Sequence, residues 1–454
     1  SLDLSKRGIM LEYIQNFAKE FLEKTEKKDI LIISHFDTDG ITSAAILGKT
    51  LKKLDRNFSF KIVKSLDKET IENLSKTKTL VFLDLGSSNI KDISDLKNNI
   101  FIIDHHEITM NFTLPENVKI INPHLYAKEE LSGSCLTYLV SRELVKKDSA
   151  SANLAVIGMV GDIMEKKVGP MTSTILGDAD ITIKKGILLY PSTRPLNKAL
   201  EYCSNPYIPG VTGDAVGASN VLREAGIEFN KKGYKALIEL NEDEMEKLVT
   251  AIALRMPDHE KMSEFLGNLF LVKFFNKLED ARELSALINA CSRMGDSNTA
   301  LLLCMGNETA RKNAEAIYIK YKQNLIEALK HMNTHPKIEG KQYVIMNAKD
   351  KIQDTIIGTV ASIMSMSALY KEGTVVITMA YNQDKIKVSS RICGRDKKDE
   401  NSKNLKQIMD EITELIGGES GGHKFAAGCV IGKDKEEAFI ELVKKKLDYE
   451  VVKI

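Results

Sequence analysis

The stretch LIISHFDTDGITSAAIL, residues 31–47, ends an apolar run with a histidine and two aspartates at alternate positions, His35, Asp37 and Asp39. The run at 30–34 is short and rich in β-branched residues, which is typical of a buried strand. Residues 40–54 then carry apolar side chains at helical spacing. A strand that leads directly into a helix predicts the first unit of a parallel α/β sheet.

The same alternation of strand and helix continues along the N-terminal part of the chain. Four further runs have the length and composition of strands, at 58–65, 79–86, 100–106 and 118–123. They are followed by helical patterns at about 134–147 and 152–164. Parallel strands joined by crossover helices form a doubly wound sheet, and this is the fold that we predict for residues 1–195.

The remaining chain divides into three parts by its pattern. Residues 196–305 are turn-rich and then helical, which predicts a helical insertion, and 306–332 predict one long connecting helix. After Pro336 strand-like runs return, at 343–346, 374–380 and 385–392, with helical patterns at about 355–369 and 404–416. We therefore predict a second, smaller α/β domain over 333–454.

Composition narrows the class of protein. The 454 residues are too many for one hydrophobic core, and 43% hydrophobic with 28% charged residues is a globular composition. No apolar run reaches the ~18–20 residues that a membrane helix needs, so we expect no membrane partner. The N-terminal segment is amphipathic and lacks the apolar core of a signal peptide, so we expect a cytoplasmic protein.

The cysteine and aromatic content gives no indication of a zinc site, a disulfide framework or a large base-stacking surface. The six cysteines are scattered without a Cys-x-x-Cys pair, which indicates neither a zinc site nor a disulfide framework. The net charge of +1 does not decide whether nucleic acid binds, because basic residues can cluster on one face. Aromatic residues make up 6% and tryptophan is absent, so a large base-stacking surface is not indicated.

Acidic and histidine residues recur at the ends of the predicted strands. They are His35, Asp37 and Asp39, then Asp84, then Asp104, His105 and His106, and finally Asp162 at the end of a helix. Ligands bind at the carboxyl ends of the strands in such sheets. Oxygen ligands with a few imidazoles suit Mn²⁺ or Mg²⁺ better than Zn²⁺. The set exceeds the need of one ion, which predicts two ions bridged by a carboxylate, with Asp84 as the natural bridge.

A simpler interpretation exists for each of these residues alone. An aspartate at a strand end is commonly a helix cap or a turn residue, and Asp39 could cap the helix that starts at Gly40. Four clusters at successive strand or helix ends are difficult to explain by capping, so we favour the metal site.

The motifs resemble a known superfamily. HFDTDGITSAA, FLDLG, IIDHHE and GMVGD are similar to the four motifs of the DHH phosphoesterases, in order and at suitable spacing. GGESGGHKFAAG (417–428) resembles the glycine–histidine signature of the accompanying DHHA1 domain. LINACSRMG (287–295) and KVSSRI (387–392) resemble segments of RecJ-type exonucleases, although Ser292 replaces a usual glycine. The chain has His35 where bacterial RecJ commonly has an aspartate, and the given sequence ends after the DHHA1 pattern, where bacterial RecJ usually continues into an OB-type domain. Both features resemble the archaeal RecJ group, which includes the GINS-associated nuclease.

The resemblance implies a role for each metal-site residue. One ion would be held by His35, Asp37 and Asp84, and the other by Asp39, Asp84, His105 and Asp162. Asp104 is expected to orient His105, as a carboxylate commonly does for a ligating imidazole. His106 is expected to donate a hydrogen bond to the scissile phosphate. A third metal ligand is the alternative for His106.

The resemblance also implies residues that bind substrate. Gly421, Gly422 and Gly428 would let the backbone approach a phosphate, and His423 would add a donor. Arg391 offers a planar fork to phosphate, and Ser389 lies on the same strand face. Asn289 and Arg293 are four residues apart and share a helix face, although Arg293 is alternatively a surface ion-pair residue. Ser132 or Ser134 is expected to cap a helix, with phosphate binding there as the alternative.

The resemblance as a whole implies a metal-dependent exonuclease that hydrolyses phosphodiester bonds from one end of a single strand, in replication or repair. We expect 5′ to 3′ action on single-stranded DNA, with RNA as an alternative substrate, and two divalent cations, Mn²⁺ in preference to Mg²⁺. Because the group that the chain resembles includes a GINS-associated nuclease, the GINS complex is a candidate protein partner. One alternative is a phosphodiesterase of small molecules or dinucleotides. Another is a replication scaffold that binds GINS, which predicts eroded metal motifs, whereas every expected ligand is present.

Overall fold

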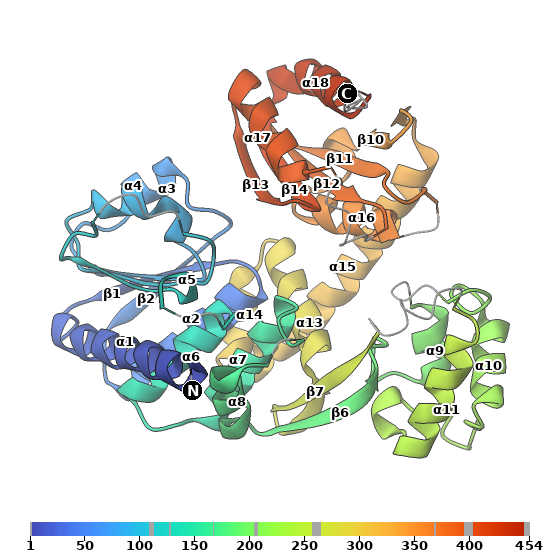
Figure 1. Cartoon of the computed structure of the whole chain (residues 1–454), viewed down its shortest axis with the longest axis horizontal. Helices are drawn as coiled ribbons and strands as arrows, with labels where there is room; N and C mark the ends of the chain where they lie inside the picture. The colour runs from blue at the N-terminus through green and yellow to red at the C-terminus, as the bar shows by residue number, and fades with distance from the viewer. Residues whose placement is uncertain are drawn as a thin grey trace. The chain divides into compact units, whose positions relative to one another are not determined.

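The structure is a computed structural model that describes residues 2–108, 113–126, 129–166, 168–203, 208–256, 265–366, 369–394 and 403–448 (Figure 1). The chain forms two compact units. The first consists of residues 1–202 and 209–318, and the second of residues 203–208 and 319–454.

The first unit contains the predicted parallel sheet of five strands. They are β1 (Ile30–His35), β2 (Phe58–Val63), β3 (Thr79–Leu83), β4 (Ile100–Ile103) and β5 (Val118–Ile121). The order is β2-β1-β3-β4-β5, with every neighbouring pair parallel. The order reverses between β1 and β3, so the sheet has its topological switch point at the ends of these two strands.

Helices cover both faces of this sheet, as a doubly wound fold requires (Figure 1). One face carries α1 (Leu2–Lys24), α2 (Thr38–Lys53), α6 (Gly133–Leu144) and α7 (Ser149–Gly161), and the other α3 (Lys68–Glu72) and α4 (Ile90–Ser94). Shorter helices are η1 (Ser87–Asn89), α5 (Pro123–Tyr126) and α8 (Pro170–Asp178). The strands are apolar on both faces, because Ile32 and Ile33 enter different core clusters.

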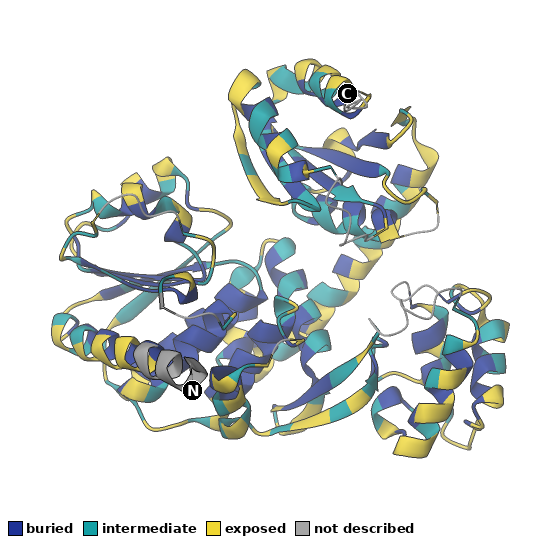
Figure 2. Cartoon of the chain, in the orientation of Figure 1, coloured by how far each residue is buried: buried dark blue, intermediate teal, exposed yellow. Residues whose placement is uncertain are grey.

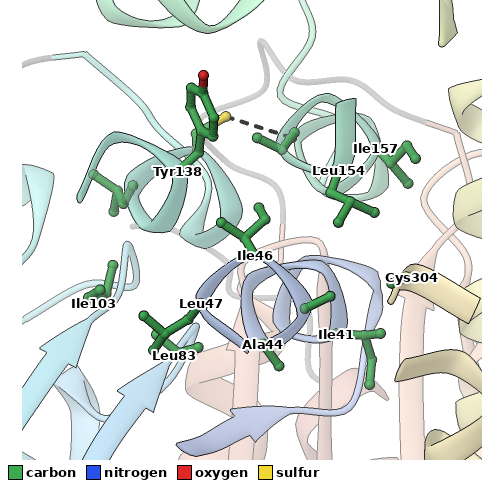
Figure 3. Packing of buried hydrophobic residues seen from close by; sticks show 14 of the residues in the cluster. Ile41, Ala44, Ile46, Leu47, Leu83, Ile103, Tyr138, Leu154, Ile157 and Cys304 are labelled. Carbon is green, nitrogen blue, oxygen red and sulfur yellow. Dashed lines mark hydrogen bonds between the residues drawn. The ribbon is translucent and has the colours of Figure 1, made fainter. Parts of the chain in front are cut away.

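Helix α2 is buried along most of its length (Figure 2). Figure 3 shows it between the sheet on one side and α6 and α7 on the other. Leu47 lies beside Leu83 of β3, and Ile46 points toward Tyr138 of α6 and Leu154 of α7. A helix packed on all sides has a fixed N-terminus, and that N-terminus carries the first acidic motif.

The predicted helical insertion contains strands that the sequence did not reveal. Helices α9 (Leu196–Glu201), α10 (Ala215–Glu224) and α11 (Glu242–Ala253), with η2 (Leu237–Glu239), follow β6 (Ile181–Ile187). β7 (Leu266–Phe274) and β8 (Lys277–Asp280) then complete an antiparallel three-stranded sheet in the order β6-β7-β8. The segment 196–305 is thus the expected helical insertion, and in addition it contains β7 and β8, which were not predicted. A short apolar run such as LFLVKF (269–274) is too short for its hydrophobic periodicity to distinguish a strand from a buried helix.

Two helices after β8 join the core of the parallel-sheet domain. They are α13 (Ala281–Arg293) and α14 (Ser297–Cys304). Leu284 and Ile288 of α13 are buried in the same cluster as Ile41 of α2. α15 (Glu308–Thr334) follows as a single long helix, close to the expected connecting helix.

The second unit is the expected smaller α/β domain. Its six-stranded sheet has the order β13-β14-β12-β11-β10-β9, and β10 and β11 are the parallel pair. The strands are β9 (Ile338–Glu339), β10 (Tyr343–Asn347), β11 (Val375–Asn382), β12 (Lys385–Ile392), β13 (Glu419–His423) and β14 (Ala426–Gly432). The helices are η3 (Lys349–Lys351), α16 (Asp354–Met366), α17 (Leu405–Ile416), η4 (Lys433–Lys435) and α18 (Glu436–Asp448). Within the described ranges, no helix combines the length and the apolar character needed to cross a membrane.

Candidate metal centre

The first motif lies at the junction of β1 and α2. His35 is the last residue of β1, and Asp37 is the N-cap of α2, where its carboxylate accepts a hydrogen bond from the Gly40 N–H at 3.0 Å. The capping role that the sequence allowed for Asp39 therefore belongs to Asp37. Asp39 lies in the first turn of α2 and is fully buried.

The N-terminus of α6 binds the Asp39 carboxylate. The backbone N–H of Gly133 donates to Oδ2 at 2.5 Å, and that of Ser134 donates to Oδ1 at 3.0 Å. These are free helix N-terminal donors, and the helix dipole favours a negative charge there. Ser132 is the N-cap, as one of the sequence alternatives predicted. Asp39 occupies the position that the other alternative gave to a phosphate.

Asp84 follows β3 directly and has a left-handed backbone, with φ of 56°. Its N–H donates to the Ile103 carbonyl of β4 at 2.9 Å, which holds the residue in this conformation. For a residue other than glycine this conformation costs on the order of 1 kcal/mol. Both carboxylate oxygens are buried and accept no hydrogen bond.

Three groups of ligand-type atoms share Asp84. One of them combines Asp84 with His105 and His106, and Nδ1 of His106 lies 3.9 Å from Oδ1 of Asp84. In another, Nδ1 of His35 lies 2.9 Å from Oδ2 of Asp37 and 3.4 Å from Oδ2 of Asp84. In the third, Nε2 of His105 lies 3.2 Å from Oδ1 of Asp84, 3.2 Å from Oδ2 of Asp162 and 3.8 Å from Oδ2 of Asp39. These last two are the sets that the resemblance implied, brought together from four segments of the chain.

The chemistry of this donor set fits divalent cations. Nδ1 of His35, Nε2 of His105 and both oxygens of Asp84 are buried, and they face one another and the carboxylates of Asp37 and Asp162 without well-directed hydrogen bonds. A cation would offset the mutual repulsion of these buried carboxylates. Across the described parts of the chain, no Lys or Arg pairs with the carboxylates that line the two groups. Carboxylates with a few imidazoles suit Mn²⁺ or Mg²⁺.

Without a cation, burial and the crowding of charges raise the pKa values of several side chains in the site, so these side chains keep their protons to higher pH. Burial, with the nearby charges of Asp37 and Asp39, raises the pKa of Asp84 to about 8. Burial and the charge of Asp39 raise the pKa of Asp162 to about 6. Burial alone would lower the pKa of His105, but its pairing with Asp162 and Asp84 outweighs this and raises the pKa to about 12. A cation must therefore displace protons in order to bind.

Asp104 orients a different histidine from the one that we expected. Its Oδ1 lies 2.7 Å from Nδ1 of His106, whereas it contacts His105 through the backbone N–H at 2.8 Å. The prediction that Asp104 orients the His105 ring was wrong, because the His105 ring points toward Asp84 and Asp162. The hydrogen bond with Asp104 raises the pKa of His106, and half of the His106 side chain is exposed.

Three further contacts support the site, and nothing in the sequence indicated the partner of each. Asn122, after β5, donates to the His106 carbonyl at 2.9 Å and so holds the loop after β4. Gly158 lets α7 approach Asp39, because a Cβ there would lie 2.6 Å from Oδ1. Asn289, predicted to bind substrate, accepts a hydrogen bond from the Thr38 N–H at 3.0 Å. Arg293, the other residue of that pair, ends α13 and is partly buried.

The other residues predicted to bind substrate gather on one sheet of the second unit. Ser389 pairs with Gly428, and Gly428 pairs with Gly421. Two residues further along each strand, the register aligns Arg391, Ala426 and His423. Directly paired residues share a face, so these side chains lie on one side of the sheet. Nε of Arg391 donates to Ser362 of α16 at 3.0 Å, whereas Gly421, Gly422 and His423 are exposed.

Models of known protein families match three separate parts of the chain. The model of the DHH family N-terminal domain matches residues 29–161, that of the DHH-CID domain matches 189–268, and that of the DHHA1 domain matches 340–448. An uncharacterized protein of Methanocaldococcus jannaschii is 30% identical over an alignment of 432 residues, and the match covers 91% of this chain and 92% of the relative.

Solved structures share the fold at low identity. Exonuclease RecJ bound to manganese has 16% identity and a TM-score of 0.61, over 96% of this chain and 95% of that one. CDC45 from Entamoeba histolytica has 14% identity and a TM-score of 0.63, over 95% and 96%. RecJ from Thermus thermophilus, in complex with Mn²⁺, has 17% identity and a TM-score of 0.60, and 96% of this chain spans 54% of its length. The chain therefore belongs to the DHH/DHHA1 superfamily, and its fold is similar to those of RecJ and CDC45.

Proposed function

We propose that the protein is an exonuclease dependent on two divalent cations that removes nucleotides from one end of single-stranded nucleic acid. The proposed substrate is single-stranded DNA, cleaved 5′ to 3′, in replication or repair. The observation that supports it most strongly is the pair of ligand groups that share the buried Asp84 and bring carboxylates and imidazoles within 4.8 Å of one another. Similarity of fold to an exonuclease RecJ bound to manganese supports the same chemistry.

The ligand assignment that we propose has His35, Asp37 and Asp84 around one cation and Asp39, Asp84, His105 and Asp162 around the other, with Mn²⁺ as the ion. When bound, two such ions lower the pKa of water and neutralise charge on the phosphoryl group. His106 would donate a hydrogen bond to a phosphate oxygen where negative charge develops. Asp104 would keep the His106 ring protonated and oriented for that donation, since its carboxylate lies 2.7 Å from Nδ1.

We assign substrate binding to the second sheet, at the exposed residues of β13 and the neighbouring part of β12. A phosphate could approach the backbone at Gly421 and Gly422, because these residues have no side chain. His423 is an exposed donor beside them, and the Arg391 guanidinium lies in the same row of the sheet. Ser389 is buried beneath Gly358 and would act by holding this row in place.

A replication scaffold is the second candidate, and the similarity of fold to CDC45 favours it. Such a protein would bind a replication partner, for which GINS is our proposal, without needing a metal site. The complete set of ligand-type residues in this chain argues for catalysis, although one protein can have both roles.

The test uses single-stranded DNA and RNA, each labelled separately at the 5′ and the 3′ end and incubated with the protein and Mn²⁺. Immediate release of a 5′-labelled mononucleotide from DNA would support the proposal. Release from the 3′ end, or from RNA alone, would retain the chemistry and overturn the polarity or the substrate. Hydrolysis of dinucleotides without cleavage of longer strands would indicate a small-molecule phosphodiesterase. Cleavage of none of these would favour the scaffold.

A further inference from the structure

Thr38 lies between two proposed metal ligands and is held by a distant helix. Its N–H donates to Oδ1 of Asn289 at 3.0 Å, and its Oγ1 donates to the Ser285 carbonyl at 2.9 Å. The Ser285 hydroxyl lies 3.2 Å from the same Oγ1. Thr38 is buried, and 251 residues separate it from Asn289, so tertiary packing alone creates these contacts.

The position of Thr38 determines where its two neighbours point. Asp37 faces the group that contains His35, and Asp39 faces the group that contains His105. Thr38 is the first residue of α2, so its N–H has no partner within the helix. Asn289 supplies that partner. A rotation of the backbone at Thr38 would move both carboxylates, one in each ligand group.

Helix α13 is a rigid base for this contact, because Leu284 and Ile288 anchor it in the core. It also adjoins the segment that carries Asp162. A Cβ at Gly161, the residue before Asp162, would lie 3.1 Å from the Ser285 hydroxyl. One turn of α13 therefore contacts two of the segments that supply carboxylates.

We propose that Ser285 and Asn289 are positioning residues that set the affinity of the site for divalent cations by holding the Asp37–Asp39 loop. This proposal rests on the proposed function only in requiring that the site binds a cation. It gives Asn289 a different role from the substrate contact that its sequence position suggested.

The experiment measures Mn²⁺ binding to the full chain by titration calorimetry, without substrate. We expect Asn289→Ala to weaken Mn²⁺ binding about 10–100-fold, the usual effect of removing a residue that supports metal ligands. Thr38→Val removes the hydroxyl contacts and should also weaken binding. Thr38→Ser keeps them and should bind like the wild type.

Asn153→Ala is the matched control. Asn153 is also an asparagine that joins distant segments, since it donates to the Lys273 carbonyl at 2.8 Å and accepts from the Asp180 N–H at 2.9 Å, away from the ligands. It should lower the melting temperature and leave Mn²⁺ affinity unchanged.

The outcomes separate the two proposals. Unchanged Mn²⁺ affinity in Asn289→Ala, with a raised KM for the nucleic acid, would overturn this inference and restore the substrate contact. Equal weakening in Asn153→Ala would also overturn it, because general destabilisation would then be the cause. A wild type that binds no Mn²⁺ would overturn the proposed function, and the positioning role with it.

Discussion

At the scale of single residues, Asp84 has three properties that together indicate function. It is buried, its backbone is left-handed, and neither carboxylate oxygen accepts a hydrogen bond. Each of these costs stability, and such costs persist where a function maintains them. A residue placed between His35 and His105 in this state has the geometry of a ligand that bridges two ions.

Replacement of Asp84 tests this assignment most directly. We expect Asp84→Asn to lower turnover with Mn²⁺ by at least about a thousandfold, because an amide cannot replace the charge of a bridging carboxylate. The metal-free variant should be about as stable as the wild type at pH 7, since the raised pKa of Asp84, about 8, means that its carboxyl group is already neutral there. Turnover and urea unfolding measured on the same preparations check both expectations. Near-normal turnover would remove Asp84 from the ligand set.

The affinity of the site for Mn²⁺ should increase with pH. The raised pKa of Asp84, about 8, means that the metal-free site holds a proton at pH 7 that a cation must displace. Each displaced proton changes the affinity by about tenfold per pH unit below that pKa. We therefore expect weaker binding at pH 6 than at pH 8, with proton release seen by calorimetry in two buffers of different ionisation enthalpy. Affinity that is independent of pH would contradict the protonated state of the site.

At the scale of helices and strands, the sequence predicted what local pattern encodes. The five parallel strands and α2 were expected because their apolar runs are bounded by turn and acidic residues. The partner of Asp104 was predicted wrongly, because two adjacent histidines give no sign in sequence of which ring points inward. The donors to Asp39 were missed for another reason. They are backbone N–H groups of Gly133 and Ser134, and every residue except proline has one.

The packing of α6 against α7 depends on Gly158. A Cβ there would collide with the Ser134 hydroxyl and lie 2.6 Å from Oδ1 of Asp39. We expect Gly158→Ala to lower the free energy of unfolding by about 1–3 kcal/mol and to weaken Mn²⁺ binding, because α7 must move away from Asp39. Gly177→Ala in α8 is the control, since nothing lies within 4 Å of its added Cβ. Equal melting temperatures for the two variants would show that α7 has room to adjust.

At the scale of the whole molecule, the sequence predicted two α/β parts and a long helix, but it placed β7 and β8 in a helical segment. β7 pairs with β6, and Val272 is the partner of Ile181. No local sequence pattern reveals a pairing between strands that lie so far apart along the chain. The proposed cation ligands all belong to the first unit, and the exposed glycines and His423 belong to the second. Cation binding and the stability of the second unit are therefore expected to be separable.

Calorimetric unfolding should show this separation. Mn²⁺ at about 100 times its dissociation constant stabilises the state that binds it by about 2.7 kcal/mol. In a unit of this size that corresponds to a rise of roughly 4–5 °C in melting temperature. We expect one transition to rise with Mn²⁺ and a second to stay unchanged, because the core of the second unit contains no proposed ligand. In Asp84→Asn neither transition should move. If both transitions rise together in the wild type, the two units unfold as one and the expected separation is wrong.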